Sequence, residues 1–509
     1  MTNNTSNNKT IAKNATFLYL RLFISIAINF ISSRLVLQAL GVSDYGIYNV
    51  VGGVIVLINF ISSALSMSTS RFLSYSLGKQ DKDLVHKTFC TAFILHLTIA
   101  CAFLIIAESI GLWFINTQLV IPSDRMGAAN WVFQATIVST FAGITQVPYN
   151  SMISSNEKFD VFAYIEILNT LLKLIVALTI LHVTIDRLRL FSILTMVQAL
   201  TIMTTYRVYC LKKFDESHFK WLLDKSLLKS MLSYSGWSLY YSGSLTTMQQ
   251  CQNILINRFF GTIINAAAGV ATVLQGVLYA FIGNITTAFN PQIIKEYARG
   301  NYQRVNTLIN WGTIATSIFT VIISLPSIIC LDTLMSLWLA EVPKGAVEIC
   351  TILLVSNIFN SFNPLVAYGV IASGKVKYMN FICGTIYLIQ IAVAYIVLKL
   401  TGNYLYMYIC NLLNPILTGF TYSTLLKKYM QTFDVSIFYR KIYFRIILMS
   451  SITFLILWEI KDSISNQIIS LIVITLISSI IVLFTTYVFI IDSNARKLLL
   501  NYVKNKIKR

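Results

Sequence analysis

Several charged side chains lie inside long apolar stretches of this sequence. The cations are Arg34, Lys173 and Arg258, and the carboxylates are Glu108 and Glu166. An ionisable group at the centre of a bilayer costs about 2.5–3.5 kcal/mol on insertion scales, so each one invites a functional explanation. Arginine forms paired hydrogen bonds with phosphate and keeps its charge at any relevant pH. The cations are therefore candidates for binding an anionic ligand, and either carboxyl group is a candidate for carrying a coupling proton.

Two more arginines belong to this basic group, and simpler explanations stay open for several members. Arg21 lies only about 9 Å into the first apolar stretch, so its long side chain could reach the membrane surface. Arg34 could do the same at the opposite surface. Arg71 begins a predicted inner loop, where it could meet a ligand or simply be solvated. Glu108 lies near an outer end, where interfacial solvation is an ordinary explanation.

Amides and prolines add polar chemistry to the same stretches. Carboxamides could bond sugar hydroxyls, but they also join helices within bilayers. The candidates for a polar path are Gln249, Asn253, Asn257, Gln275, Asn284 and Asn290. Proline frees a backbone carbonyl within a helix, so Pro148, Pro364 and Pro415 are candidate hinges.

The sequence shows no constellation for catalysis, metal binding or nucleotide hydrolysis. The four histidines are dispersed, and the eight cysteines include no C-x-x-C pair. No G-x-x-x-x-G-K-[ST] motif occurs, and no connecting segment exceeds about 30 residues. We therefore expect neither a cofactor nor a metal site. The energy for its activity would come from an ion gradient or the membrane potential.

Composition identifies the class of protein. Of 509 residues, 56% are apolar and 12% are charged, and the mean hydropathy is +0.70. A soluble globular protein carries about 25% charged residues, so this chain is predicted to be an integral membrane protein. The formal net charge of +19 resides mostly in short segments between apolar stretches, which favours a role in membrane orientation over nucleic-acid binding.

A helix needs about 20 apolar residues to cross a bilayer, and this length predicts about fourteen spans. The second, seventh, eighth and twelfth are rich in Gly, Ser, Asn and Gln, which is typical of helices that face protein or a cavity. The spans lie near residues 16–38, 46–66, 89–115, 129–150, 160–182, 188–210, 231–256, 263–289, 308–330, 346–371, 378–399, 403–426, 442–460 and 467–491.

The loops set the orientation. With a cytoplasmic N-terminus, about 28 Lys and Arg residues fall inside and about 6 outside, a strong positive-inside bias. An odd number of spans would break this alternation, so we expect both termini to be cytoplasmic.

Landmarks of the first half recur in the second. Gly41 pairs with Gly261 at an offset of 220, and Tyr75-x-x-Gly78 pairs with Tyr297-x-x-Gly300 at 222. Pro148 and Lys158 pair with Pro364 and Lys375 at 216 to 217. Because the offset covers six spans, an even number, the halves would share one orientation, as in transporters that hold substrate between two lobes.

The predicted organisation follows from this repeat. It comprises a cytoplasmic tail (1–14), an N-lobe of six spans (15–210), a linker (211–230), a C-lobe of six spans (231–430), two further spans (431–491) and a basic cytoplasmic tail (492–509).

Five stretches carry a family resemblance over about residues 15 to 430. They are SSRLVLQALGVSDYGIYNVVGG from Ser32, RFLSYSLGKQDKD from Arg71, WVFQATIVSTFAGITQVPYNSMISSNEKFD from Trp131, INRFFGTIINAAAGVA from Ile256 and FNPQIIKEYARGN from Phe289. They resemble the polysaccharide and O-antigen (Wzx-like) flippases of the multidrug/oligosaccharidyl-lipid/polysaccharide (MOP) exporter superfamily, particularly their Bacteroides-type members.

The resemblance implies a fold of fourteen helices in two lobes. It further implies a bacterial inner-membrane flippase that moves an undecaprenyl-pyrophosphate-linked oligosaccharide outward by alternating access. Its partners would be that glycolipid, membrane lipids, and a polysaccharide polymerase with a chain-length regulator. Two alternatives remain. An ion-coupled drug antiporter of the same architecture would want a net acidic site. An oligosaccharide polymerase or lipid-dependent glycosyltransferase would usually expose a sizeable outer loop.

Overall fold

The computed structural model describes residues 2–117, 121–183, 185–339, 342–464, 466–490 and Arg496. Every regular element in these ranges is helical, and no strand occurs in them. The predicted all-helical fold is therefore confirmed. The basic tail predicted at 492–509 lies outside the described residues, apart from Arg496.

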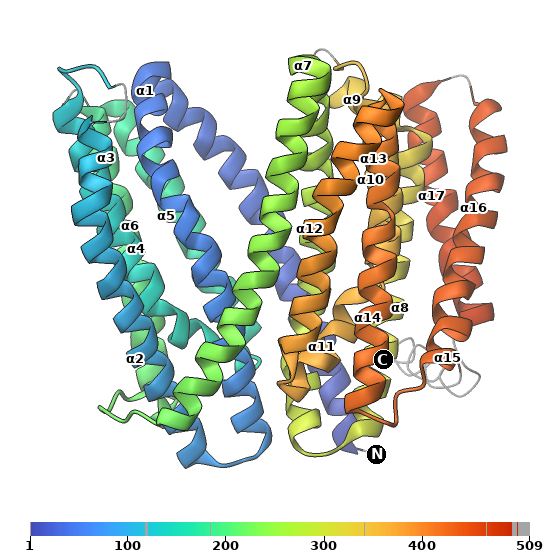
Figure 1. Ribbon diagram of the computed structural model, residues 1–509, viewed down its shortest axis with the longest axis horizontal. Coiled ribbons are helices and arrows are strands. Elements are labelled where there is room, and N and C mark those ends of the chain that lie inside the picture. Colours follow the sequence, from blue (N-terminus) through green and yellow to red (C-terminus); the bar gives the residue numbers. More distant parts are fainter. Residues whose placement is uncertain are drawn as a thin grey trace, which may run out of the picture. The chain divides into compact units, whose positions relative to one another are not determined.

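The first half of the chain contains nine elements up to the long helix that leads into the second half. They are α1 (Thr2–Gly78), α2 (Lys82–Ile106), η1 (Ala107–Gly111), α3 (Leu112–Thr117), α4 (Met126–Ser155), α5 (Phe159–His182), α6 (Arg187–Lys213), η2 (Asp215–Ser217) and α7 (Lys225–Ala298). Figure 1 labels most of them along the chain.

The remaining elements follow after Gly300. They are α8 (Tyr302–Ile329), α9 (Leu331–Trp338), α10 (Ala346–Asn360), α11 (Asn363–Ser373), α12 (Val376–Thr401), α13 (Tyr404–Asn411), α14 (Leu413–Tyr429), α15 (Val435–Phe438), η3 (Tyr439–Tyr443), α16 (Phe444–Asp462), α17 (Gln467–Thr485) and η4 (Thr486–Ile490).

Nine helical stretches within the described residues are long and apolar enough to cross a membrane. The bent pair α10 and α11, which meet at 45°, makes a tenth span if it is counted as one. These ten stretches coincide with ten of the fourteen predicted spans. The chain is thus a multi-pass membrane protein.

The other four predicted spans are also helical. They are residues 46–66 in α1, 129–150 in α4, 231–256 in α7, and 403–426 across α13 and α14. Three of them are spans whose Gly, Ser, Asn and Gln content predicts contact with protein or a cavity. The fourth belongs to α4, which is among the most buried helices of its bundle.

The two long helices α1 and α7 each break at a glycine. Gly41 has φ 74° and ψ 170°, and Gly261 has φ 75° and ψ −167°. This region of backbone space is essentially restricted to glycine. No atom lies within 4 Å of the Cβ that either glycine lacks, so backbone conformation alone requires glycine there. The predicted equivalence of Gly41 and Gly261 is confirmed by their shared conformation.

Helix starts repeat the same correspondence. Lys158 before α5 has φ −83° and ψ 57°, and Lys375 before α12 has φ −89° and ψ 56°. The residue with positive φ before α2 is Gln80, and the one before α8 is Gly300. The predicted pairing of Gly78 with Gly300 is therefore wrong by two residues, because Gly78 is still helical, and the offset of 220 holds here as well.

The chain divides into two compact units. Unit 1 comprises Met1–Ser242 with Ile294–Arg299, and unit 2 comprises Gly243–Ile293 with Gly300–Arg509. The short segment at the end of α7 is tied to unit 1 by an ion pair in which Lys295 Nζ lies 2.6 Å from Glu157 Oε1. The lobe boundaries stated above stay predictions.

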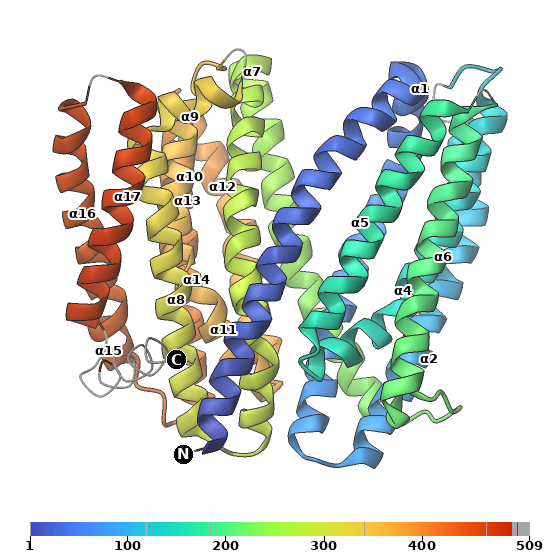
Figure 2. The same cartoon turned by 180° about the vertical axis from the view of Figure 1, so that it is seen from behind.

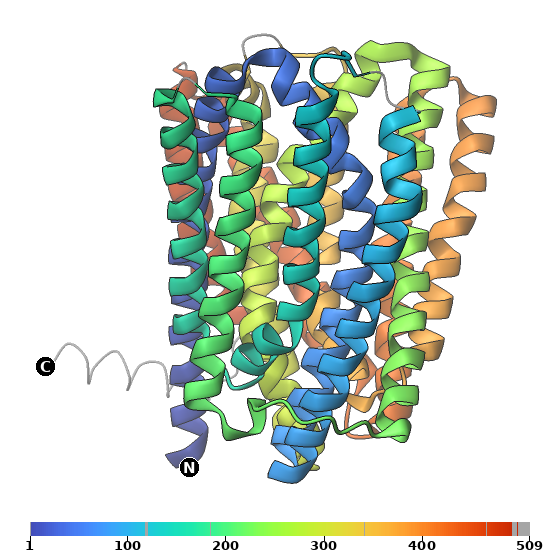
Figure 3. The ribbon, with the colours of Figure 1, turned by 90° about the vertical axis from the view of Figure 1, so that its left-hand side faces the viewer.

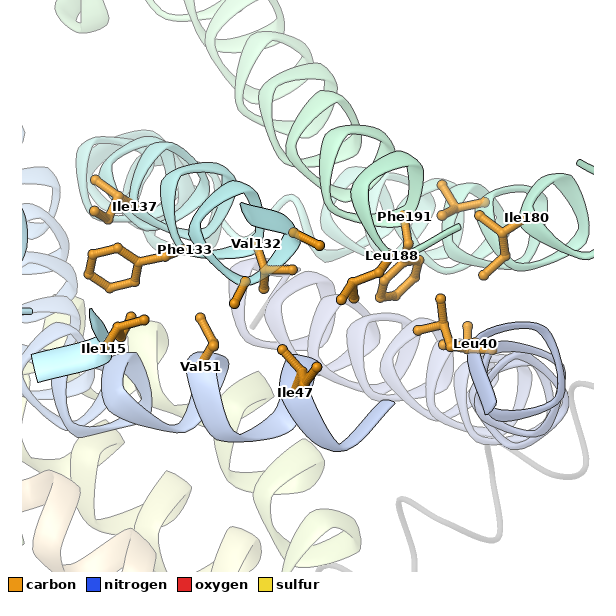
Figure 4. Packing of buried hydrophobic residues seen from close by; sticks show 14 of the residues in the cluster. Leu40, Ile47, Val51, Ile115, Val132, Phe133, Ile137, Ile180, Leu188 and Phe191 are labelled. Atoms are coloured by element: carbon orange, nitrogen blue, oxygen red, sulfur yellow. The ribbon is translucent and has the colours of Figure 1, made fainter. Parts of the chain in front are cut away.

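Unit 1 is a bundle in which α1 packs on α5 and α4, and α4 packs on α6 (Figure 2). Its helices run nearly parallel to one another when seen from the side (Figure 3). The core at one end brings Ile47 and Val51 of α1 towards Val132 and Phe133 of α4, with Leu188 of α6 beside them (Figure 4). The second stretch of α1 thus owes its position to apolar packing.

A charged cluster holds the Gly41 break within unit 1. Arg125 Nε donates to Asp44 Oδ1 at 3.0 Å, and the same guanidinium bonds Asp186 at 3.3 Å. Burial opposes the charge of Arg125, yet these two carboxylates hold its pKa above its ordinary value. Arg187 also donates to the carbonyl of Ala39, a backbone acceptor beside the break, at 3.0 Å.

In unit 2 the residues at two corresponding positions are uncharged. At the offset of 220, Ile264 takes the place of Asp44 and Gly345 that of Arg125. A Cβ on Gly345 would lie 2.6 Å from Tyr404 Oη and 3.3 Å from Ile264 Cδ1. The halves therefore share a backbone break but surround it differently, with ion pairs in unit 1 and close packing of Tyr404 and Ile264 around Gly345 in unit 2.

Replacing either break glycine by alanine should destabilise the protein by about 1–3 kcal/mol, because a Cβ strains this conformation. Gly41→Ala and Gly261→Ala should each lower the Tm of the purified protein in detergent. Gly236→Ala is the matched control, because Gly236 lies in the helical part of α7 with equally open surroundings. Alanine should leave its Tm unchanged or higher. Equal effects at all three positions would contradict this explanation.

Candidate functional site

Three of the predicted cations are exposed. Arg34 lies in α1 and Lys173 in α5, both in unit 1, whereas Arg258 lies in α7 within unit 2. Arg34 precedes the Gly41 break by seven residues, and Arg258 precedes the Gly261 break by three. No ion pair of these cations occurs among the described residues. Their role in binding a phosphate stays a prediction.

Arg21 and Glu166 belong to one cluster on α1, α5 and α6. The guanidinium carbon of Arg21 lies 5.3 Å from the ring centre of Phe162, and that ring lies 6.4 Å from the ring of Tyr206. The Tyr206 hydroxyl donates to Glu166 Oε1 at 3.1 Å. Glu166 is half-buried and hydrogen-bonded, and its role in ion coupling stays a prediction.

Arg71 is placed differently from the expectation. It was expected at the start of a loop, but α1 continues to Gly78, so Arg71 lies inside the helix and is only 7% exposed. Its guanidinium carbon stacks 4.7 Å from the ring of Phe72 and 4.9 Å from that of Tyr75. Aromatic faces stabilise a cation that has lost its contact with water, so these two rings help to stabilise the buried charge of Arg71.

Glu108, the second predicted acid, lies in the π-helical turn η1. Gln134 of α4 donates to its Oε2 at 3.1 Å. Glu108 is therefore bonded to a neighbouring helix as well as partly exposed. Single-turn π-helices occur often at functional sites, but they also form where a helix accommodates one extra residue.

Arg207, which lies in α6 within the sixth predicted span, is not among the residues predicted from the sequence. Its Nη2 donates to Thr145 Oγ1 at 2.9 Å, and its guanidinium carbon stacks 5.5 Å from the ring of Tyr149 and 5.9 Å from that of Phe93. The signal was available, because Arg207 satisfies the same criterion as Arg34: a cation inside an apolar stretch. Tyr206 and Gln134 gave no such signal, since only the fold brings them to Glu166 and Glu108.

The amides of α7 divide into exposed and buried groups. Gln249, Asn253 and Asn257 are exposed at intervals of four residues, so they form one stripe along the helix. Thr246 and Gln250 are exposed beside them. We call these five residues the polar stripe of α7. Carboxamides in contact with acyl chains would lose their hydrogen bonds to water, so the stripe indicates a surface that faces water or a polar ligand.

The remaining amides take part in packing. Gln252 is buried and exchanges two hydrogen bonds of 3.0 Å with Asn411, which also accepts from Gln390 at 2.9 Å. Gln275 donates to Asn357 at 3.3 Å, and Asn284 is 6% exposed. Asn290, the last of the predicted set, is half-buried. Within the described residues, therefore, Gln275 and Asn284 take part in helix packing, the alternative left open by the sequence.

The three prolines mark different kinds of position. Pro148 lies inside the continuous helix α4. Pro364 lies in the first turn of α11, at the 45° bend after α10, and Pro415 lies in the first turn of α14, just after the interruption between α13 and α14. Their action as hinges stays a prediction.

No group of three or more metal-ligating side chains occurs in the part of the chain that the structure describes. All eight cysteines are free thiols.

The amides of α7 provide a matched test of this division. Gln252→Ala should destabilise the protein by about 1–3 kcal/mol, because Gln252 is buried and its loss leaves the half-buried Asn411 short of hydrogen bonds. Gln249→Ala removes the same side chain three residues away, on the exposed stripe, and should leave the Tm within error of the parent. Thermal unfolding of both purified variants checks this difference. A larger loss at Gln249 would mean that the stripe is a packing surface.

Comparison with solved structures identifies the fold. Neither a family model nor a curated protein matches the sequence. A MATE structure in the bent conformation aligns with a TM-score of 0.74 at 13% identity, covering 84% of this chain and 97% of that one. A mutant of a MATE transporter from Vibrio cholerae aligns with a TM-score of 0.71 at 14% identity, covering 85% of this chain and 99% of that one. A MOP-superfamily transporter from Pyrococcus furiosus aligns with a TM-score of 0.67 at 12% identity, covering 83% of this chain and 96% of that one. That transporter is described as having a binding pocket of reversed polarity. The chain therefore has the fold of the MATE-type transporters of the MOP superfamily.

Proposed function

We propose that this chain is a flippase for lipid-linked oligosaccharides in a bacterial inner membrane. The observation that carries the proposal is the exposed polar stripe of α7 with the cation Arg258 beside it, in a span that ends at a glycine break. The stripe offers carboxamides to sugar hydroxyls, and the guanidinium offers bidentate hydrogen bonds to phosphate oxygens. The fold supports a transporter, and the resemblance of the sequence supports the substrate class.

Arg34 supplies the matching cation in the first half of the chain. Like Arg258, it precedes the glycine break of its helix and is exposed. In the proposed cycle, cations from both halves neutralise the pyrophosphate while the polyprenyl tail stays in the lipid. Rocking of the two lobes then exposes the headgroup to the other side of the membrane.

Coupling would come from an ion gradient or from the membrane potential. Glu166 is the proposed proton carrier, because it is half-buried and its partner Tyr206 can donate a hydrogen bond to the ionised carboxylate. Glu108 is the less favoured carrier because of its partly solvated position.

The charge pattern favours this proposal over the antiporter. A pump for cationic drugs would want a net acidic site, whereas the carboxylates Glu166 and Glu108 are only partly exposed. The exposed ionisable groups noted above are the cations Arg34, Lys173 and Arg258.

Arg34→Gln and Arg258→Gln should each reduce glycolipid translocation by about tenfold or more, the expected loss of one charge-assisted hydrogen bond. Surface polysaccharide would be measured in a deletion strain that expresses each variant, with immunoblots for protein level. Lys87→Gln is the control, since Lys87 is an exposed cation in the first turns of α2.

The leaflet on which the glycan accumulates separates the functions. A flippase defect leaves the lipid-linked glycan on the cytoplasmic leaflet. Unpolymerised glycan on the outer leaflet would instead indicate a polymerase, and lost dye efflux with normal polysaccharide would indicate an antiporter. Normal polysaccharide in both variants, at normal protein level, would refute the basic path.

A further inference from the structure

Unit 2 contains a cavity that has no part in the proposed transport path. It has a volume of about 360 Å³, within the usual range of ligand pockets. Its walls come from the first turns of α8, the loop before α15, the helices α15, η3 and α16, and the last residue of η4. Figures 1 and 2 show α16 and α17 side by side next to α8, with α15 at one end.

One side of the cavity is basic. Lys441 lies in the π-helical turn η3, and Arg445 follows one turn later in α16. No carboxylate pairs with either cation in the described part of the chain. Arg445 uses one nitrogen to donate to the carbonyl of Phe489 at 2.6 Å, which fixes the guanidinium at the wall while other N–H groups remain available. Asp434 also lines the cavity, with one carboxylate oxygen accepting from Ile437 N at 3.0 Å.

The deeper wall is apolar. Asn306 lies about 6 Å along α8 from its first residue, and Ile314 lies about 18 Å along it, at 1.5 Å per residue. Ile442 and Ile490 are buried beside the cavity, and Trp311 is 38% exposed. Along α8, a helix apolar enough to cross a membrane, the lining amides Asn306 and Asn310 precede Trp311 and Ile314, and tryptophan is enriched at the headgroup level of such helices.

Two carboxamide oxygens at the wall accept no hydrogen bond from the described residues. Asn306 Nδ2 donates to the carbonyl of Thr432 at 2.7 Å, but its Oδ1 is buried and accepts no hydrogen bond within the described structure. Asn310 Oδ1 is in the same situation one turn deeper. Buried acceptors are ordinarily satisfied, so this wall has room for a donor from a bound molecule, either directly or after a small rotation of the amide.

We propose that this cavity binds the phosphodiester headgroup of a membrane phospholipid. Lys441 and Arg445 would bind the phosphate, a headgroup hydroxyl or ammonium would approach Asp434 and the two asparagines, and an acyl chain would lie against Ile314 and Ile442. A membrane lipid fits better than free phosphate, because the apolar wall and Trp311 offer nothing to a soluble anion. The site lies in the last two spans and α8, so it would act on the packing of unit 2 and not as a translocation site.

Lipid titration of the delipidated, full-length protein tests the proposal. Native mass spectrometry and thermal shift would follow the addition of dioleoylphosphatidylglycerol, of dioleoylglycerol with the same chains but no phosphate, and of inorganic phosphate. We expect one saturable site for the phospholipid and none for the other two molecules. Lys441→Gln should weaken that site by about tenfold or more, because one charge-assisted hydrogen bond is lost.

Arg440→Gln is the matched control, because Arg440 is an exposed cation of the same π-helical turn and does not line the cavity. It should bind the phospholipid like the parent protein. Ile314→Trp, which fills the apolar end without removing a charge, should weaken binding while the protein stays monodisperse. The proposal is wrong if Lys441→Gln and Arg440→Gln bind equally, if dioleoylglycerol binds as tightly, or if inorganic phosphate alone saturates the site.

Discussion

A polar side chain in contact with hydrocarbon loses its hydrogen bonds to water, and this cost constrains the whole molecule. Gln252 avoids it by bonding Asn411 between helices, and Glu166 avoids it by accepting from Tyr206. The polar stripe of α7 is exposed instead. A sequence that keeps such a stripe in a membrane helix therefore implies water or a polar ligand along that face, and the proposed glycolipid path depends on this single inference.

The glycine breaks change the direction of the two long helices α1 and α7. Each break redirects a helix that would otherwise run straight, and each requires a backbone conformation that only glycine adopts readily. In unit 1 the break is fixed by Arg125 between two carboxylates, and in unit 2 it is fixed by close packing around Gly345. The two halves thus keep the same backbone break, while the residues packed around it differ.

Much of the fold could be predicted from the sequence, because the length of an apolar stretch and the separation of two glycines can be read directly from the residues. The equivalence of Gly41 and Gly261 needed only an offset, and ten predicted spans coincide with membrane-length helices. The candidate site was harder to predict, because the exposure of each side chain depends on how its helix is rotated about its own axis. Gln249 and Gln252 are indistinguishable by composition, yet one is exposed and the other is buried. The helix end at Gly78 was also missed, because the sequence around Arg71 resembles a loop.

Solvent accessibility along α7 tests the central claim most directly. Spin labels would be placed at Asn253 and Asn257, and at Ile389 of α12 as an exposed apolar reference, in a background that lacks the eight native cysteines. Collision rates with a water-soluble nickel complex and with oxygen, measured in reconstituted membranes, distinguish water from acyl chains. Labels on the stripe should favour the nickel complex and the label at Ile389 should favour oxygen. Oxygen-dominated collisions at Asn253 and Asn257 would mean that the stripe faces lipid and that no polar path runs along α7.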